Sequence, residues 1–494
     1  MSQLLTVSRA ARLVGVARGI LQARIQGGEL NAHDGMVSAD DLLRLYPEVR
    51  LEEAGAFERV TRIKEESFGR RVLERMLPSQ DMLAQRLFEQ GRELADVRAH
   101  LQQYHTLVVR LEEKVRALAH AAAGEARDIL SLLQAYLQSE LQGVLGSSEQ
   151  ANALSVMDDI LRVMSAHVVV HPSGHDFFVD GADTVLDAAL RAGLSLNYGC
   201  SSGNCGLCKA RVVSGQVQRV RHHDYVLSEA EKLQGYTLLC SNTAVGDLVI
   251  EALEASDPAD IPRQQIVARV KAIKRLSEDV VMLHLQMPRS NRLRFLAGQS
   301  VTLTTLGAEA IQLPVASCPC DDRNLQFHVR RDPNHGFAQK VFSGLEQGDT
   351  VTVWGPWGEF VLRPGSARPI VFVACDTGFA PVKSLIEHAM ALETAEKVHL
   401  YWLATRPGGH YLSNLCRSWA SALDYFSYTA IGGSAGEGDV VRGASDIVRH
   451  IDADHPDLRR FDVFLAGPVP FADTVSALLA QRRFPPEQLM VAAV

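Results

Sequence analysis

The spacing of hydrophobic positions changes twice along the chain. Over residues 94–118, apolar residues alternate steps of three and four, which predicts a helix with a heptad seam formed by Leu94, Val97, Leu101, Tyr104, Val108, Leu111, Val115 and Leu118. From residue 266 to about 362, short strand-like runs such as IVARVKAI and VVMLHLQM, punctuated by Gly and Pro, predict an antiparallel β-barrel. Beyond residue 368, apolar strands such as PIVFVAC and DVFLAGP alternate with helical stretches, which predicts a doubly wound parallel α/β sheet.

These patterns divide the 494 residues into five predicted units. We expect a multidomain protein whose N-terminal part is all-α. The five units are a helical unit (1–50), a proline-poor helical and coiled-coil region (51–165), a strand–turn–strand–helix unit (166–256), the barrel (262–365) and the α/β unit (366–494). The seam at 94–118 leaves two alternatives open. It can form a homodimer with a second copy, or it can pack on the amphipathic segment 129–144 of its own chain.

The first 50 residues predict two short helices. Ser8 can cap the first, Gly15-Val16 forms a turn, and the second helix runs from about residue 17 to residue 26. The stretch TVSRAARLVGVARGILQARIQGGEL resembles the helix-turn-helix of the excisionase and MerR-like winged-helix group. Its arginines suit DNA phosphate contacts, and they are Arg9, Arg12, Arg18 and Arg24. Because residues 1–50 hold six arginines against five acids, docking to a protein or a purely structural role remains the alternative.

Composition narrows the class of protein. A net charge of -8 gives no general attraction to nucleic acid or to an anionic membrane. No apolar run approaches the roughly 18–20 residues that span a bilayer, and the start MSQLLTVSRAARLVG lacks the long apolar stretch of a secretory signal. Eight cysteines in such a chain favour reduced thiols with metal or redox uses, so we expect a cytoplasmic protein.

Three of these cysteines crowd into the segment YGCSSGNCGLCKA. Cys200, Cys205 and Cys208 have C-x4-C-x2-C spacing, and Cys240 follows in LLCSNT. This is the spacing of plant-type [2Fe-2S] ferredoxins, in which four thiolates hold two irons and small residues let backbone N–H groups turn toward the sulfurs. A zinc site is the alternative, although zinc sites prefer paired C-x2-C knuckles and only one such pair occurs here. Residues 166–255 as a whole resemble a plant-type ferredoxin domain, which implies a β-grasp fold and metal ligation by these four cysteines.

Residues 262–494 resemble the ferredoxin-NADP reductase superfamily. The resemblance rests on GPWGEFVL, PIVFVACDTGFAPVKSLIEHA and FDVFLAGPVPF, and in organisation it is nearest to oxygenase reductase components and the CDP-6-deoxyglucoseen reductase type. It implies that NAD(P)H reduces FAD, which passes single electrons to the [2Fe-2S] centre and on to an electron-acceptor protein such as an oxygenase. The positions that it implies for cofactor binding are Ala316, Ser317 and Gly336 for FAD, and Thr377, Gly378, Ala380, Pro381, Gly467 and Pro468 for NAD(P)H.

Several positions depart from the family pattern. Ile311, Leu313 and Pro314 stand where the flavin motif has arginine, tyrosine and serine, so a charge-assisted bond and a hydroxyl are missing. Asp376 replaces a glycine of the nicotinamide loop, which puts a like charge near the phosphates, and Ala466 replaces a cysteine. Two functions therefore stay open: an NAD(P)H-dependent oxidoreductase, or a redox-sensing regulator, assembly protein or electron relay on a reductase scaffold that has lost FAD, NAD(P)H or both.

Overall fold

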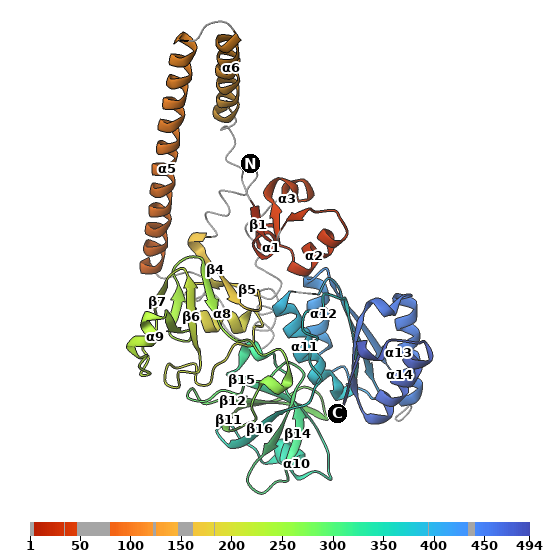
Figure 1. The fold of residues 1–494 in the computed structure, drawn as a ribbon. Coiled ribbons are helices and arrows are strands. Elements are labelled where there is room, and N and C mark those ends of the chain that lie inside the picture. Colours follow the sequence, from red (N-terminus) through yellow and green to blue (C-terminus); the bar gives the residue numbers. More distant parts are fainter. Residues whose placement is uncertain are drawn as a thin grey trace.

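The computed structural model describes residues 4–33, 35–46, 80–121, 125–146, 162–181, 183–393, 395–432 and 440–494. Four packed units form the body of the molecule, and a long helical hairpin projects from it (Figure 1). The parts of the predicted helical region at 51–79 and 147–161 lie outside the described residues. Among the residues that are described, no helix combines the length and apolar character needed to cross a membrane.

The sequence predicted an all-α N-terminal unit, and this prediction is wrong. The unit also contains a small antiparallel sheet in the order β1-β3-β2. Leu5 and Val37 pair across this sheet and are buried, which explains why two short segments became strands. Thr6 rather than Ser8 caps the first helix, and Gly15 at φ 71° ends it. The elements are β1 (Leu4–Thr6), α1 (Val7–Val14), α2 (Arg18–Gln26), β2 (Ala32–His33), β3 (Met36–Ser38) and α3 (Ala39–Leu45).

The arginines of α1 and α2 contact carboxylates of the unit that follows the hairpin. Arg18 lies 2.8 Å from Asp176, whose carboxylate also accepts hydrogen bonds from Ser8 and His167. The other two contacts are Arg12 with Asp180 at 2.6 Å and Arg9 with Asp247 at 3.3 Å. We call these three ion pairs the clasp. Three of the four arginines that suited DNA phosphates therefore bind acids of their own chain, whereas Arg24 pairs loosely with Glu29 at 3.8 Å.

Loss of one clasp contact should loosen the N-terminal unit. We expect Arg18→Ala to lower the opening free energy of α1 and α2 by about 1–3 kcal/mol, because it removes a charged hydrogen bond from a buried carboxylate. Native-state hydrogen exchange of the α1 and α2 amides measures this. Arg44→Ala is the control and should change it by less than about 0.5 kcal/mol, since the Arg44 side chain is 80% exposed and pairs with Asp41 of its own helix α3. Equal losses in both variants would contradict the clasp.

The hairpin consists of α5 (Gln80–Ala121) and the shorter α6 (Glu125–Gly146), which run side by side away from the body (Figure 1). The predicted helix over 94–118 is confirmed as part of α5. Of its seam, Val115 is 7% exposed. Most of the other seam residues remain exposed.

The cysteine-bearing unit is a mixed five-stranded sheet in the order β5-β4-β10-β6-β8, with β4 and β10 parallel and with a separate β7–β9 pair. Alternating residues of β5 point inward, so that Phe177 and Val179 join the core with Leu186 of α8. This arrangement is the one expected of a β-grasp fold. The elements are β4 (Ser165–His171), β5 (Asp176–Asp180), α8 (Val185–Arg191), β6 (Lys209–Ser214), β7 (Val217–Arg219), α9 (Glu229–Leu233), β8 (Tyr236–Leu238), β9 (Asn242–Ala244) and β10 (Leu248–Glu251).

The third unit is a six-stranded antiparallel sheet, in the order β14-β13-β16-β11-β12-β15, that curls into a near-barrel. The predicted strands are confirmed, and their inward residues form one core with Phe337 of α10. The elements are η1 (Pro258–Asp260), β11 (Gln264–Arg275), β12 (Val280–Gln286), β13 (Ser300–Thr304), β14 (Ile311–Pro314), η2 (Pro319–Asp321), β15 (Asn324–Arg330), α10 (Gly336–Ser343) and β16 (Thr350–Trp357).

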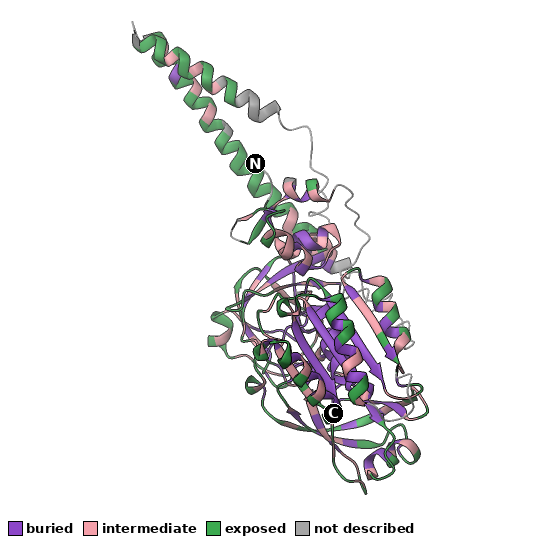
Figure 2. Cartoon of the chain, turned by 90° about the vertical axis from the view of Figure 1, so that its right-hand side faces the viewer, coloured by how far each residue is buried: buried purple, intermediate pink, exposed green. Residues whose placement is uncertain are grey.

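The C-terminal unit is a parallel five-stranded sheet in the order β19-β18-β17-β20-β21, with helices on both faces. Phe372 packs toward α11 and α12, whereas Val371 and Val373 pack toward α13 and α14, which explains why these strands are apolar throughout (Figure 2). The predicted doubly wound sheet is confirmed. The elements are β17 (Ile370–Cys375), η3 (Asp376–Gly378), α11 (Phe379–Leu392), β18 (Val398–Ala404), α12 (Ser413–Ala422), β19 (Phe426–Gly432), α13 (Val440–Asp454), η4 (Leu458–Arg460), β20 (Asp462–Gly467), α14 (Val469–Gln481), η5 (Pro486–Gln488) and β21 (Leu489–Ala493).

A buried histidine pair should make this unit acid-sensitive. His399 Nδ1 lies 3.0 Å from His455 Nε2, and burial together with His455 lowers the pKa of His399 to about 4. Between this value and the unfolded value of about 6.5, the unfolded chain binds more protons, so stability falls as pH falls. From pH 7 to pH 4 we expect a loss of roughly 2–3 kcal/mol from His399.

Urea titrations followed by tryptophan fluorescence measure this loss, since Trp402 and Trp419 are buried in the same unit. His399→Gln should flatten the pH dependence. His222→Gln is the control, because the His222 side chain is 81% exposed. A pH dependence that His399→Gln leaves unchanged would contradict the assignment.

Candidate functional site

The four predicted cysteine ligands lie close together as two pairs. Cys208 Sγ lies 3.1 Å from Cys240 Sγ, and the Cys205 N–H donates to Cys200 Sγ at 3.4 Å. Among the described residues, no three metal-ligating side chains converge on a single point. Two thiol pairs suit a cluster in which each of two irons takes two thiolates, so the donor set fits a [2Fe-2S] centre.

Backbone N–H groups of the segment 198–208, which we call the cluster loop, point at the first sulfur. Ser202, Asn204 and Cys205 direct their N–H groups at Cys200 Sγ from 3.3 to 3.5 Å. Burial raises the pKa of the Cys200 thiol, but the N–H groups of Ser202 and Asn204 outweigh it and lower this pKa to about 7. The loop can turn this tightly because Gly203 and Gly206 adopt φ values of 83° and 75°. Such a loop is built to stabilise thiolates.

One side of the cluster loop is packed against the barrel. The Arg292 N–H donates to Gly199 O at 2.8 Å, and the Arg292 guanidinium donates to Ser201 Oγ at 3.2 Å. Asp322 lies 3.9 Å from the same guanidinium and hydrogen bonds to Tyr198; burial raises the pKa of Asp322 to about 6. All of these side chains are buried, so the loop and the barrel share a fixed polar interface.

The opposite side of the loop faces solvent. Cys205 is exposed, and the Leu207 side chain next to it is 51% exposed. His223 packs closely against the loop at Gly203. A Cβ added to Gly203 would lie 2.5 Å from the Cβ of His223. The site therefore has one face toward the barrel and one face toward solvent.

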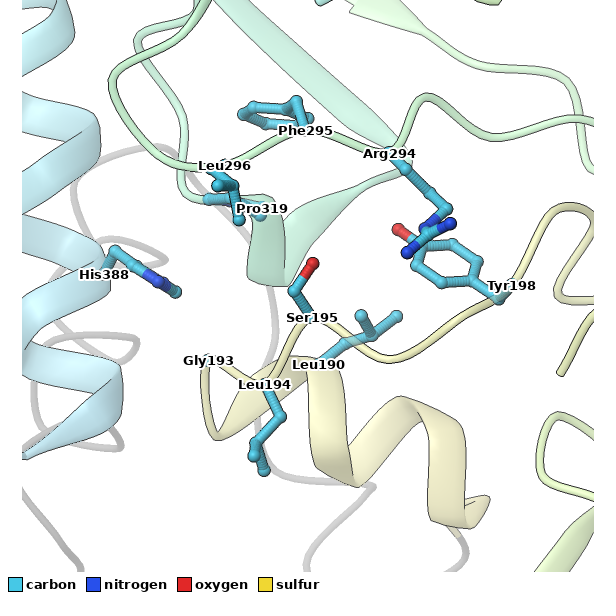
Figure 3. A pocket seen from close by; sticks show the side chains of 10 residues that line it. All are labelled: Leu190, Gly193, Leu194, Ser195, Tyr198, Arg294, Phe295, Leu296, Pro319 and His388. Carbon is cyan, nitrogen blue, oxygen red and sulfur yellow. The ribbon is translucent and has the colours of Figure 1, made fainter. Parts of the chain in front are cut away.

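A small hollow lies where the cysteine-bearing unit, the barrel and α11 meet (Figure 3). It is lined by Leu190, Gly193, Leu194, Ser195, Tyr198, Arg294, Phe295, Leu296, Pro319 and His388. Arg294 stands over the Tyr198 ring at 5.9 Å and donates to Asn197 at 2.8 Å. The hollow lies at the boundary of three units. Its lining shows that the cysteine-bearing unit, the barrel and the α/β unit are in close contact.

The predicted flavin positions at Ala316 and Ser317 are buried and bonded within the chain. Lys383 Nζ donates to Ala316 O at 2.9 Å, and Ser384 Oγ donates to Ser317 O at 2.8 Å. Ser317 Oγ accepts from the Gln326 N–H at 3.2 Å. These contacts tie the barrel to α11, so the polar groups at both positions are hydrogen bonded within the chain.

The third predicted flavin position, Gly336, begins α10. No side chain caps this helix end, a Cβ on Gly336 would have 3.8 Å of clearance, and the neighbouring His335 Nδ1 is buried without a partner. An uncapped helix N-terminus next to an unpartnered polar atom fits the pyrophosphate of FAD. Ile311 and Leu313 on β14 add no charge or hydroxyl to this fit.

The predicted nicotinamide positions gather around the end of β17, beside β20, where the strand order reverses. This is the switch point at which open α/β sheets bind ligands. A Cβ on Gly378 would lie 2.2 Å from Ala466 O, and one on Gly467 would lie 2.8 Å from Cys375 Cβ. Both glycines are therefore required by packing. The other predicted positions are Thr377 in η3, Ala380 and Pro381 in the first turn of α11, and Pro468 at the start of α14.

The side chain of Asp376 fills this turn. Its carboxylate accepts the Thr405 N–H at 3.0 Å and the Thr405 hydroxyl at 2.5 Å, and the residue adopts φ 47°, which is unusual outside glycine. Next to it, Phe379 stacks on Trp402 with ring centroids 4.0 Å apart. Asp376 therefore puts a buried, hydrogen-bonded carboxylate in the loop where the family pattern has a glycine, while α11, which follows the loop, begins without a side-chain cap.

The fold and the paired thiols define a modular electron-transfer protein. Residues 168–245 match the model of the 2Fe-2S iron-sulfur cluster binding domain, and residues 267–362 match the oxidoreductase FAD-binding domain. The first match contains all four cysteines of the site. The chain therefore carries a [2Fe-2S] domain joined to an FAD-binding-type domain.

Relatives that match 62% of this chain narrow its family further. The chain is 32% identical over 306 residues to the CDP-6-deoxy-L-threo-D-glycero-4-hexulose-3-dehydrase reductase of Yersinia pestis, which covers 62% of this chain and 91% of that protein. It is 31% identical over 317 residues to the reductase component of propane 2-monooxygenase from Gordonia sp. (strain TY-5), covering 62% and 90%. The chain belongs to the ferredoxin reductase family, which includes the reductase components of oxygenases. A solved relative, the Amycolatopsis cytochrome P450 reductase GcoB, is 25% identical with a TM-score of 0.43 and covers 66% and 98%.

The sequence did not single out Arg292, Asp322 or the buried pair of Lys383 and Glu387, whose side chains are fully buried 2.8 Å apart. The i, i+4 spacing of the last pair was visible, but such pairs usually lie on solvated faces. Nothing in the local pattern around Arg292 or Asp322 signals a contact with the cluster loop.

The four-cysteine site makes a direct prediction. Cys240→Ser should abolish the visible absorption of the cluster and lower bound iron from about two per chain, because one iron loses a thiolate. Anaerobic absorption, electron paramagnetic resonance after dithionite reduction and iron analysis measure this. Cys416→Ser, a buried cysteine of α12, is the control and should keep the cluster. One zinc per wild-type chain in place of iron would contradict the prediction.

Proposed function

We propose that this chain is an electron-transfer oxidoreductase that moves single electrons between its flavin-type module and a [2Fe-2S] centre, and on to an acceptor protein such as an oxygenase. The proposed ligands of the centre are Cys200, Cys205, Cys208 and Cys240. The observation that supports this best is the two-sided setting of the cluster loop. Its inner face is packed on the barrel through Arg292, and its outer face exposes Cys205 and Leu207.

In this proposal the chain fixes distance and charge. A flavin bound to the barrel would accept a hydride and release single electrons. Arg292 holds the cluster loop against the barrel, and the N–H groups of the loop stabilise the anionic cluster. The uncapped N-terminus of α10 offers a place for the flavin pyrophosphate.

The relatives support an external acceptor. One is named as the reductase of a dehydrase, and another as the reductase component of a monooxygenase. The family resemblance further implies NAD(P)H as the source of electrons. An acceptor would approach the exposed side of the loop, since the other side is buried.

A second candidate is favoured by Asp376. If the chain's own carboxylate closes the nicotinamide loop, electrons do not enter from NAD(P)H, and the protein acts as a redox-sensing regulator or electron relay on a reductase scaffold. The missing charge and hydroxyl at Ile311 and Pro314 point in the same direction.

One experiment separates the two candidates. The protein is purified anaerobically, extracted for flavin, and mixed with NADH or NADPH while cluster absorption is followed. A reductase should contain FAD and bleach within seconds to minutes. Protein whose cluster bleaches with dithionite but with neither nucleotide would overturn the NAD(P)H-dependent function and support the relay.

The charge at residue 376 can be tested on its own. Asp376→Asn keeps a side chain that tolerates positive φ and removes the charge, so it should tighten NAD(P)H binding roughly tenfold or more by relieving like-charge repulsion. Asp376→Gly additionally removes the side chain that fills the turn and should tighten binding further. Isothermal titration of NADPH into each variant measures this, with Asp473→Asn on α14 as control. Unchanged affinity in both variants would show that Asp376 does not block the loop.

A further inference from the structure

The seam of α5 is an apolar stripe that the described part of the chain leaves largely uncovered. Six of its eight residues are 48–67% exposed, with Leu101 at 61% and Tyr104 at 67%; the other four are Leu94, Val97, Leu111 and Leu118. Figure 2 shows α5 exposed along most of its length. A continuous stripe of large apolar side chains marks an interaction surface.

Helix α6 does not account for the seam. It packs on the side of α5 that carries Val115, and Val108 and Glu112 on that side are half-buried. The face of α6 that turns away is itself apolar and exposed, and it consists of Ile129, Leu132, Leu133 and Tyr136. Packing on α6, the alternative left open by the sequence, therefore covers one edge of the seam, and the described residues leave the rest of it exposed.

The base of α5 is fixed to the body. The buried guanidinium of Arg86 donates to four backbone carbonyls, which belong to Val163, Met164, Val179 and Ala244. The seam begins eight residues beyond Arg86, about 12 Å along the helix axis. A helix anchored in this way holds its apolar stripe at a defined position outside the body, where a partner can reach it.

We propose that α5 pairs with α5 of a second copy of this chain in a parallel, in-register coiled coil centred on the uncovered part of the seam, residues 94–107, and continuing along Leu111 and Leu118 beside α6. The heptad spacing is the repeat that two helices need to keep one seam in contact. The seam runs for more than three heptads, or about 36 Å. The exposed face of α6 then flanks the pair along its outer half.

The flanking charges match this register. With Leu94 at position a, Glu93 occupies g and Arg98 occupies e, so each Glu93 faces Arg98 of the second copy. Both side chains are exposed. Glu93 lies 3.9 Å from Arg162 of its own chain, and the Glu93 side chain remains 67% exposed. Farther along, Lys114 and Glu112 face the uncharged Ala119 and Leu107, so no like charges oppose each other there.

The test compares the full-length holoprotein with two variants by analytical ultracentrifugation at micromolar concentrations. Leu101→Glu places a charge in the centre of the seam and should weaken dimerisation on the order of 100-fold. Gln103→Glu adds the same charge two residues away on the exposed face and should leave the dimer intact. Circular dichroism and the cluster absorption confirm that each variant is folded. A third variant, Leu101→Cys, should form an interchain disulfide on mild oxidation, whereas Gln103→Cys should not.

Each other outcome overturns part or all of the proposal. A monomeric wild type would overturn the dimer. A dimer unaffected by Leu101→Glu would place the interface elsewhere. A dimer in which Leu101→Cys fails to cross-link would overturn the parallel register. None of these results depends on flavin or nucleotide binding, so they test the dimer independently of the proposed function.

Discussion

The buried guanidinium of Arg292 joins the two halves of the electron-transfer site. It holds the cluster loop through Ser201 and lies beside Asp322 of the barrel. Without that contact, a loop rich in small residues would have few constraints on its distance from the flavin-type module. This polar interface therefore helps to fix the position of the cluster loop relative to the barrel. The carboxylate of Asp322 pays part of the desolvation cost of the arginine.

The same chemistry recurs at the other joints of the molecule. The clasp places Arg18 on Asp176, and Arg86 at the base of the hairpin satisfies four backbone carbonyls. In each case a cation from one unit is partly or wholly buried against oxygen atoms of the cysteine-bearing unit. Arginine suits these joints because its planar group can donate several hydrogen bonds at once. The cysteine-bearing unit is thus the hub to which the N-terminal unit, the hairpin and the barrel are each fastened.

How much the sequence could predict depended on the range of the interaction. The strands of the α/β sheet and the helix over 94–118 follow from local periodicity, and the structure contains them. Strands β1 and β3 were missed because each is three residues long and is stabilised by pairing across the chain. The motif around Cys200 indicated the site because metal ligation demands a fixed spacing. Arg292 gave no signal, since its partner Ser201 is 91 residues away, and the contact of Lys383 with Ala316, 67 residues away, could not be read from its spacing to Glu387.

Hydrogen bonds within the chain satisfy polar groups at several predicted cofactor positions. In a site that depends on its cofactor, polar groups lack partners until the cofactor binds. Here Ala316, Ser317 and Asp376 already have theirs, supplied by Lys383, Ser384 and Thr405. The start of α10 keeps an open helix end beside an atom without a hydrogen-bond partner, His335 Nδ1, and α11 at the nicotinamide loop also begins without a side-chain cap. The Asp376 carboxylate is therefore satisfied within the chain, whereas a helix end without a side-chain cap remains at both the flavin and the nicotinamide positions.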